Sequence, residues 1–199
     1  LLGYPPPMSK AMIQALGERK DPRALETLMF YSGHRSVELR TEAISALCAL
    51  DIKDPAVIKR IDELLLKALR DYDETVRNKA AWLLGKRRVI AAEEPLLILF
   101  GRGSSSALQA LGFVGGIRTA RALALAMEST KTSKEPIITA IGTLLSRPDF
   151  GPEPVRVQLV KILGETNLPG AQNVLMNYHA SGPDAFMRSR KLAFQILSR

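Results

Sequence analysis

The stretch DYDETVRNKAAWLLG, residues 71–85, decides the fold. With Val76 taken as offset zero, apolar or small residues follow at offsets four, seven, eight and nine, which are Ala80, Leu83, Leu84 and Gly85. This spacing places one apolar stripe on one face of a helix. Asp71 or Asp73 can accept hydrogen bonds from the free amides at the helix start, and Gly85 permits the left-handed backbone that ends a helix. The stretch therefore predicts a capped helix with one buried face.

The same pattern recurs along the chain, with further starts at Met8, Leu39, Gly103, Ser133, Val155 and Ser189. Offset four is apolar throughout, and its members are Met12, Ala43, Ala80, Ala107, Ile137, Leu159 and Ala193. Offset nine is small, and its members are Gly17, Cys48, Gly85, Gly112, Gly142, Gly164 and Ser198. The mean spacing of about 30 residues is typical of stacked two-helix repeats. The sequence thus predicts an all-α fold, an α-solenoid of about six to seven helix pairs.

Three strings resemble a known family: DPRALETLM at 21–29, DPAVIKRIDELLLKALRDYDETVR at 54–77, and PVRVQLVKILG at 154–164. They resemble HEAT repeats, and most closely the short bacterial form first associated with phycobilisome lyases. The resemblance covers nearly the whole chain. It implies a scaffold rather than an activity, because members of this broad, armadillo-like group mostly bind proteins, some bind nucleic acid, and a few are enzymes or lyase subunits.

The predicted helices alternate between two layers. Seven helices are predicted for the inner layer, at residues 9–16, from the turn at 33–36 through residue 50, at residues 74–87, ending at residue 112, at residues 133–146, starting at residue 155, and at residues 184–197. Five helices are predicted for the outer layer, at residues 21–31, 54–70, 94–100, 119–127 and 169–179. The interval from 133 to 155 is too short for an outer helix between two inner ones. We therefore expect an irregular junction at 147–154. Residues 1–7 predict an extended proline-rich linker, and residues 8–199 a single domain.

The formal net charge of +8 and the pI near 9.8 favour an acidic partner, such as nucleic acid, anionic lipid or an acidic protein surface. No dense basic run accompanies this charge, so an ordinary solvated surface is the alternative. Cys48 is the only cysteine and cannot form a disulfide within the chain. No apolar run reaches the roughly 20 residues of a membrane span, and the cytoplasm is the favoured compartment.

An arginine follows offset zero in four copies, at Arg40, Arg77, Arg156 and Arg190. The resemblance implies that such arginines form a ladder with aspartates of the turns between neighbouring repeats, here Asp71 and Asp73. Direct contact with a partner is the alternative role for the four arginines.

Offset six should point away from the core, toward a concave face lined by inner helices. Six of its seven members are polar: Gln14, Ser45, Gln109, Thr139, Lys161 and Gln195, with Trp82 as the exception. Trp82 is the only tryptophan, and an exposed tryptophan in a groove is a candidate anchor for a partner. Packing beneath the helix at 54–70 is the alternative. The predicted partner-binding residues are Asn78, Lys79, Trp82, Lys86, Arg87, Arg88 and Gln109.

The sequence predicts no catalytic residue, metal ligand or cofactor. His34 and His179 stand far apart without metal-ligand spacing, and GRGSSS at 101–106 lacks the Lys-Ser/Thr ending of a phosphate-binding loop. The predicted function is therefore a noncatalytic scaffold that binds another protein, with an acidic segment of that protein as the candidate ligand. Two alternatives stay open. One is a nucleic-acid binder resembling HEAT-like DNA glycosylases, for which Glu42 or Glu135 would supply the acid, and the other is a phycobilin lyase-type subunit.

Overall fold

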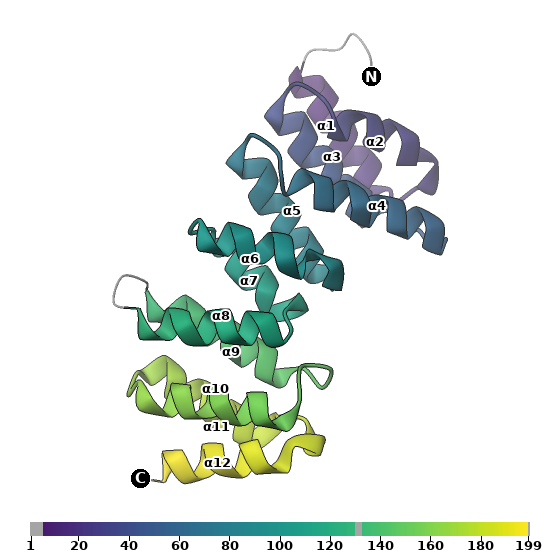
Figure 1. Cartoon of the computed structure of the whole chain (residues 1–199). Helices are drawn as coiled ribbons and strands as arrows, with labels where there is room; N and C mark the ends of the chain where they lie inside the picture. Colours follow the sequence, from purple (N-terminus) through teal and green to yellow (C-terminus); the bar gives the residue numbers. More distant parts are fainter. Residues whose placement is uncertain (1–5, 130–132, 199) are drawn as a thin grey trace. The chain divides into compact units, whose positions relative to one another are not determined.

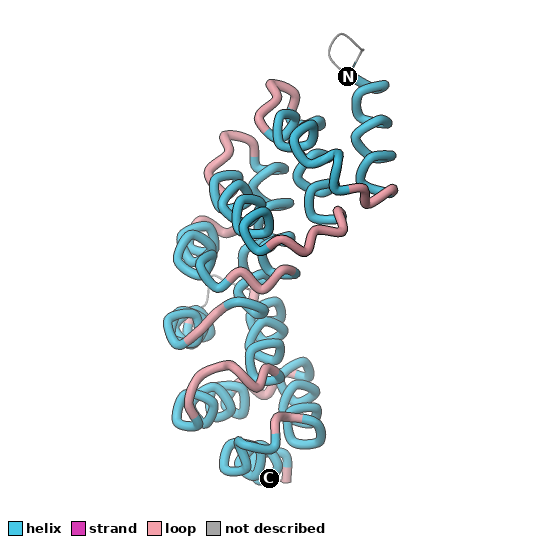
Figure 2. Tube along the Cα trace, turned by 90° about the vertical axis from the view of Figure 1, so that its right-hand side faces the viewer, coloured by secondary structure: helices cyan, strands magenta, loops and turns pink. Residues whose placement is uncertain are grey.

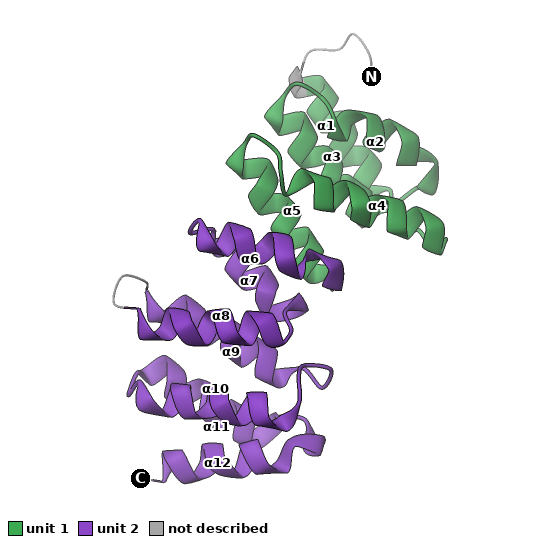
Figure 3. Ribbon diagram, viewed as in Figure 1, with its two compact units in different colours: residues 1–87 green, residues 88–199 purple. Residues whose placement is uncertain are grey.

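The computed structural model describes residues 6–129 and 133–198. Within these residues every regular element is a helix, and twelve of the helices are α-helices (Figure 1). The predicted all-α helical repeat fold is confirmed, and each predicted helix is present with bounds that differ by a few residues. Contacts divide the chain into two compact units, residues 1–87 and 88–199 (Figure 3).

The first unit contains five α-helices in two layers. They are α1 (Pro6–Glu18), α2 (Leu25–Ser32), α3 (Val37–Ala49), α4 (Pro55–Ala68) and α5 (Glu74–Lys86), and the 3-10 helix η1 (Pro22–Ala24) leads into α2. Helix α3 packs against both α1 and α5, so these three form one layer. Helices α2 and α4 form the other layer, packed on α3 and α5 respectively. Apolar side chains between the layers are fully buried, including Leu28, Ile44 and Leu65.

The second unit repeats this arrangement over seven α-helices. They are α6 (Glu93–Gly101), α7 (Ser105–Val114), α8 (Ile117–Glu128), α9 (Lys134–Ser146), α10 (Glu153–Glu165), α11 (Pro169–Ser181) and α12 (Met187–Leu197), with 3-10 helices η2 (Ile90–Ala92) and η3 (Asp184–Phe186) before α6 and α12. Contacts place α7, α9 and α11 in one layer and α8, α10 and α12 in the other (Figure 2). The core between them includes Leu123, Ile141, Leu144 and Leu163.

Short polar side chains cap the starts of four of the described α-helices, α3, α4, α5 and α7. Asp54 accepts a hydrogen bond from the Ala56 amide at 2.9 Å, and Asp73 accepts one from the Thr75 amide at 2.8 Å. Each bond satisfies an amide that has no partner inside its own helix. In the second unit Ser104 accepts a hydrogen bond from the Ala107 amide at 3.2 Å. Residues 102–104 of GRGSSS form the turn between α6 and α7, and the rest of the motif belongs to these helices.

Glycine at offset nine serves packing rather than helix termination. A Cβ atom on Gly17 would lie 3.0 Å from the Ala46 Cα atom, and one on Gly164 would lie 2.8 Å from Ile196 Cγ2. These glycines therefore mark the points where successive helices of one layer approach most closely.

The prediction that Gly85 adopts the left-handed backbone is wrong. Helix α5 continues to Lys86, and Arg88 has the positive φ of 54° instead. Lys20 and Asn167 likewise have positive φ three residues after Gly17 and Gly164.

The predicted layers of the last three helices are wrong. Helix α10, which was expected in the inner layer, packs with α8 and α12, while α11 packs with α9 and α12. The sequence template matched α10 because helices of both layers have one apolar face and a small residue at the close approach. The short interval before residue 155 therefore needs no missing helix, since α10 is itself the outer-layer helix that follows α9.

Two predictions about domain limits stay predictions. Residues 1–5 of the expected linker lie outside the described residues, and α1 already begins at Pro6. The division between residues 87 and 88 separates two groups of residues that contact one another closely, and it does not test whether the groups fold independently. A single domain over residues 8–199 is therefore still an expectation.

Candidate functional site

Helix α5 presents a tryptophan between two lysines on the surface of the first unit. Trp82 is 43% exposed, the Lys86 ammonium lies 4.5 Å from the centroid of its ring, and the Lys79 ammonium lies 5.5 Å from it. The spacing of three and four residues brings these side chains to one face of the helix. Both ammonium groups lie close enough for a cation–π attraction to the ring. No ion pair joins either lysine to an acid within the described residues.

The opposite face of α5 is buried, which fixes how Trp82 is presented. Val76, Ala80 and Leu84 are almost completely buried in the first unit. Since Trp82 is two positions from both Ala80 and Leu84, it projects on the other side of the helix. The exposed fraction of Trp82 does not fit the alternative in which the ring packs beneath the helix at 54–70.

The other predicted partner-binding residues are placed less simply. Asn78 donates a hydrogen bond to Glu74 at 3.4 Å on the same helix. Arg87 Nε donates to Asp62 Oδ1 at 2.7 Å, and both side chains are about a quarter exposed. The guanidinium of Arg87 therefore already has an acidic partner on α4. Arg88 and Gln109 are exposed, but they belong to the second unit.

Cys48 is a largely buried thiol on α3. Burial raises its pKa to about 11, and the nearby Asp62 carboxylate acts in the same direction, while Arg87 and Lys79 oppose the shift. The thiol is therefore protonated at neutral pH and has little nucleophilic character.

The four arginines after offset zero share one geometry. Each donates hydrogen bonds to acceptors in the segment before its own helix or at the end of the preceding helix. Arg40 donates to the His34 and Arg35 carbonyls, Arg77 to those of Asp71 and Tyr72, Arg156 to that of Phe150, and Arg190 to the Asp184 carboxylate and the His179 carbonyl. The guanidinium group thus fixes the shape of the turn.

Arg40 makes an additional bond that joins neighbouring repeats. Its Nε and Nη2 atoms donate to the two carboxylate oxygens of Asp71, both at 2.8 Å. Asp71 also accepts a hydrogen bond from the Asp73 amide at 2.9 Å. Hydrogen bonding to the Thr75 amide and hydroxyl lowers the pKa of Asp73. The two aspartates hold the turn that precedes α5.

Arg156 is completely buried, and no carboxylate within the described residues pairs with it. Its Nη1 atom donates to the Leu145 carbonyl at 2.6 Å, and its Nη2 atom donates to the carbonyls of Arg147 and Phe150. The Phe186 ring lies 3.6 Å from the guanidinium carbon. Several carbonyl dipoles and an aromatic face therefore replace a counter-ion around this charge.

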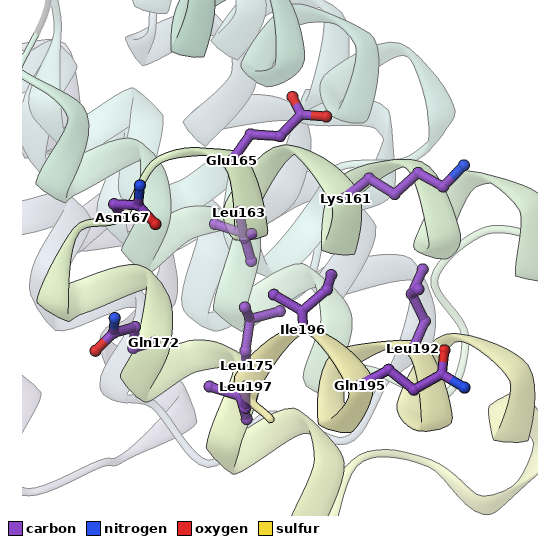
Figure 4. A pocket seen from close by; sticks show the side chains of 11 residues that line it. Lys161, Leu163, Glu165, Asn167, Gln172, Leu175, Leu192, Gln195, Ile196 and Leu197 are labelled. Carbon is purple, nitrogen blue, oxygen red and sulfur yellow. The ribbon is translucent and has the colours of Figure 1, made fainter. Parts of the chain in front are cut away.

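The predicted offset-six column does not line one face of the second unit. Lys161 and Gln195 lie on α10 and α12, whereas Gln109 and Thr139 lie on α7 and α9 in the other layer. Lys161 and Gln195 line the same pocket of about 790 Å³, which Figure 4 shows from close by. Leu192 and Ile196 contribute apolar surface to this pocket, and Glu165 is the acid on its rim.

Sequence reasoning missed a groove on the first unit between α2 and α4. Its volume is about 1280 Å³, and its lining includes Arg35, Arg60, Lys67, Arg70 and Tyr72. The signal for it is weak in the sequence, because Tyr72 falls in a turn outside the repeating apolar columns. The groove depends on a gap between two helices of the same layer, which helical periodicity does not report.

Both histidine side chains contact aromatic rings of the fold. His34 Nδ1 accepts a hydrogen bond from the Ser36 amide at 3.0 Å, and its ring stacks on Tyr31. The His179 ring lies 4.9 Å from the Phe194 ring. Among the described residues, no group of three or more potential ligands is arranged to hold a metal ion. No helix in this part of the chain has the length and apolarity needed to cross a membrane.

Comparisons with known proteins agree on the fold and go no further. No protein-family model and no curated protein matches the sequence. An engineered protein of known crystal structure is similar in fold, with a TM-score of 0.55 and 20% identity, over 100% of this chain and 93% of that one. A designed armadillo repeat protein aligns with 94% of this chain and 92% of its own length, at 19% identity and a TM-score of 0.37. The first of these supports the helical repeat fold.

Proposed function

We propose that this chain is a noncatalytic, HEAT-like scaffold that binds another protein through the α5 surface of its first unit. The observation that carries the proposal is Trp82, an exposed aromatic ring between two lysines, neither of which forms an ion pair with an acid of the described residues. Tryptophan is enriched among residues that dominate the free energy of protein binding. The lysines favour a partner that places carboxylates beside an apolar side chain.

The finer assignment to HEAT repeats is part of this proposal. It is supported by the repeated arginine after offset zero and by the Arg40–Asp71 pair between successive repeats. In this arrangement the arginines stabilise turns, and α5 supplies the contact surface. The partner-binding set is then centred on Trp82, Lys79 and Lys86, with Asn78 beside them.

Arg87 has a smaller part in the proposed contact, and Arg88 and Gln109 belong to the second unit and are left out of it. Charge reversal of Arg87 would place two carboxylates together, because its present partner is Asp62. Such a variant would lose stability as well as binding. Lys79 and Lys86 are better positions for testing the charge of the surface.

The test is capture of partners from an extract of the source organism, with the full chain immobilised and bound proteins quantified by mass spectrometry. We expect Trp82→Ala to cost about 2 kcal/mol of binding free energy, or roughly a thirtyfold loss of affinity. Lys79→Glu combined with Lys86→Glu should also release the partner. The matched control is Phe30→Ala, because Phe30 is an exposed aromatic residue on α2 of the same unit.

A partner that is captured equally by wild type and Trp82→Ala would contradict the proposal. The same experiment separates protein from nucleic acid as the partner. If duplex DNA is retained at low salt and Trp82→Ala weakens that retention while no protein is lost, the α5 surface is a nucleic-acid site instead.

A further inference from the structure

The groove between α2 and α4 is a second surface of the first unit, on the layer opposite α5. Its walls come from the end of α2 with the following turn, and from the second half of α4. Met29 and Leu64 contribute apolar surface, and the turn residues Asp71 and Tyr72 also line the groove. The groove is open, with a volume of about 1280 Å³, which is enough for several side chains of an extended segment.

The groove has an excess of positive charge. Its lining contains five basic side chains, Arg35, Arg40, Arg60, Lys67 and Arg70, and two acidic ones, Glu63 and Asp71. The difference is three positive charges, counted with His34 neutral. An isolated acidic segment would therefore be attracted to this surface.

Two of the arginines already have acidic partners. Arg40 is paired with Asp71 in a largely buried bidentate contact. Arg60 Nη1 lies 3.2 Å from Glu26 Oε1. No ion pair joins the side chains of Arg35, Lys67 or Arg70 to an acid within residues 6–129 and 133–198, and all three residues are exposed. These three cations are available to a partner without the loss of an existing ion pair.

Tyr72 is an exposed aromatic ring that the fold holds in one position. It is 76% exposed, yet its hydroxyl donates to the Arg35 carbonyl at 3.3 Å and the Arg40 guanidinium lies 4.5 Å from its ring centroid. Arg40 is itself fixed by Asp71. An aromatic side chain that is already ordered loses little conformational entropy when a partner covers it.

We propose that this groove binds an acidic segment of a partner protein, with an apolar side chain of the segment against Tyr72 and its carboxylates near Arg35, Lys67 and Arg70. The apolar lining, which includes Met29 and Leu64, favours a peptide over a continuous phosphate backbone, because a peptide can place apolar side chains between its carboxylates. The proposal goes beyond the α5 surface and does not depend on Trp82.

The experiment uses the full chain and a short rhodamine-labelled peptide in which Glu and Asp flank a central Leu-Phe pair. Binding is measured by fluorescence anisotropy at low and at physiological salt. A peptide with Gln and Asn in place of the acids is the first control, and a duplex DNA oligonucleotide is the competing polyanion. We expect the acidic peptide to bind at least about tenfold more tightly than its neutral version, with an affinity that falls as salt rises.

The variant Lys67→Glu with Arg70→Glu should weaken binding of the acidic peptide at least about tenfold. Its matched control is Arg19→Glu with Lys53→Glu, which changes the net charge equally at two exposed positions of the same unit outside the groove. Tyr72→Leu should weaken binding about threefold or more through loss of the aromatic contact. Circular dichroism of each variant establishes that the helices are retained.

Equal weakening in the groove variant and its control would overturn the proposal, because net charge alone would then explain the binding. Failure of the wild type to bind the acidic peptide would overturn it as well. A third result would also overturn the proposal: the acidic peptide binds no better than its neutral version, while duplex DNA binds the wild type and is lost by the groove variant. We expect Trp82→Ala to keep the peptide affinity of the wild type. A loss of affinity in Trp82→Ala but not in the groove variant would assign the peptide to the α5 surface and would overturn the proposal for the groove.

Discussion

At the scale of single residues, position in the repeat determines chemical character. Cys48 occupies the small offset-nine position of its helix, and burial there raises the pKa of its thiol to about 11. Trp82 occupies offset six, where burial is incomplete and two lysines approach the ring. The sequence predicted both residues as exceptions within their columns. It could not predict that Arg87 is bound to Asp62, because that contact depends on how α4 and α5 pack.

The raised pKa of Cys48 predicts slow alkylation. At pH 8 the fraction of thiolate in the folded protein should be about a hundredfold lower than for a thiol of ordinary pKa 9.0. The rate of reaction with iodoacetamide should therefore be at least that much lower than in denaturant. A folded-state rate close to the denatured one would show that the thiol is accessible and ionised.

The same shift gives a sign for the dependence of stability on pH. The unfolded chain loses the thiol proton near pH 9, whereas the folded chain keeps it to about pH 11. The contribution of Cys48 to stability is therefore complete below pH 9 and falls as pH rises from 9 to 11. Cys48→Ala should flatten this part of the curve of unfolding free energy against pH.

At the scale of elements, glycines allow the helices of one layer to approach closely, because they have no side chain at the contact. Gly17 on α1 faces the backbone of α3, and Gly142 on α9 faces Val174 of α11. Apolar periodicity predicted every helix, since each has one buried face. It failed to predict the layer of α10, because the template describes contact with a neighbour in the same layer and both layers use the same contact. The groove at α2 and α4 was not predictable for a related reason, since a gap leaves no periodic signal.

Gly17→Ala tests the close approach of α1 and α3. Alanine favours a helix over glycine by about 1 kcal/mol in an open position. Here its Cβ would lie 2.9 Å from the Ala46 Cβ atom and 3.0 Å from the Ala46 Cα atom, so the helices must separate. We expect a net loss of about 1–3 kcal/mol in the free energy of unfolding, measured in urea.

The matched control for this substitution is Gly101→Ala at the end of α6. No atom lies within 4 Å of the added Cβ there, and Gly101 does not have a positive φ. This variant should have unchanged or slightly increased stability. If the two variants had equal unfolding midpoints, the close contact at Gly17 would have no energetic importance.

At the scale of the whole molecule, the net charge of +8 is distributed over both units. Residues 1–100 contain 16 basic and 14 acidic residues, and residues 101–199 contain 12 basic and 6 acidic residues. The sequence predicted this excess but not its local pattern. Several basic side chains, among them Arg40, Arg77 and Arg156, donate hydrogen bonds within the fold, so these donors are not free to bind a partner. On the first unit, the cations near Trp82 and Tyr72 differ from other exposed cations in lying close to an exposed aromatic ring.

This distribution predicts only weak binding to duplex DNA. The protein should be retained on immobilised DNA at low salt and released before physiological ionic strength, because few phosphates are neutralised together. Trp82→Ala should leave the salt concentration of release unchanged, as measured by a stepwise salt elution. Retention above physiological salt would indicate a specific nucleic-acid surface.

The turn arginines hold backbone oxygens, and every amino acid carries one. Arg156 and Arg77 therefore keep the loop shape regardless of which side chains the loop displays. Substitutions of the loop side chains leave these hydrogen bonds and the packing of the flanking helices intact. The loop surface can therefore change in chemistry during evolution. Arg77 donates a hydrogen bond to the carbonyl of Tyr72, and this bond does not depend on the Tyr72 side chain. The side chain at this position is therefore free to change during evolution into one that binds a partner.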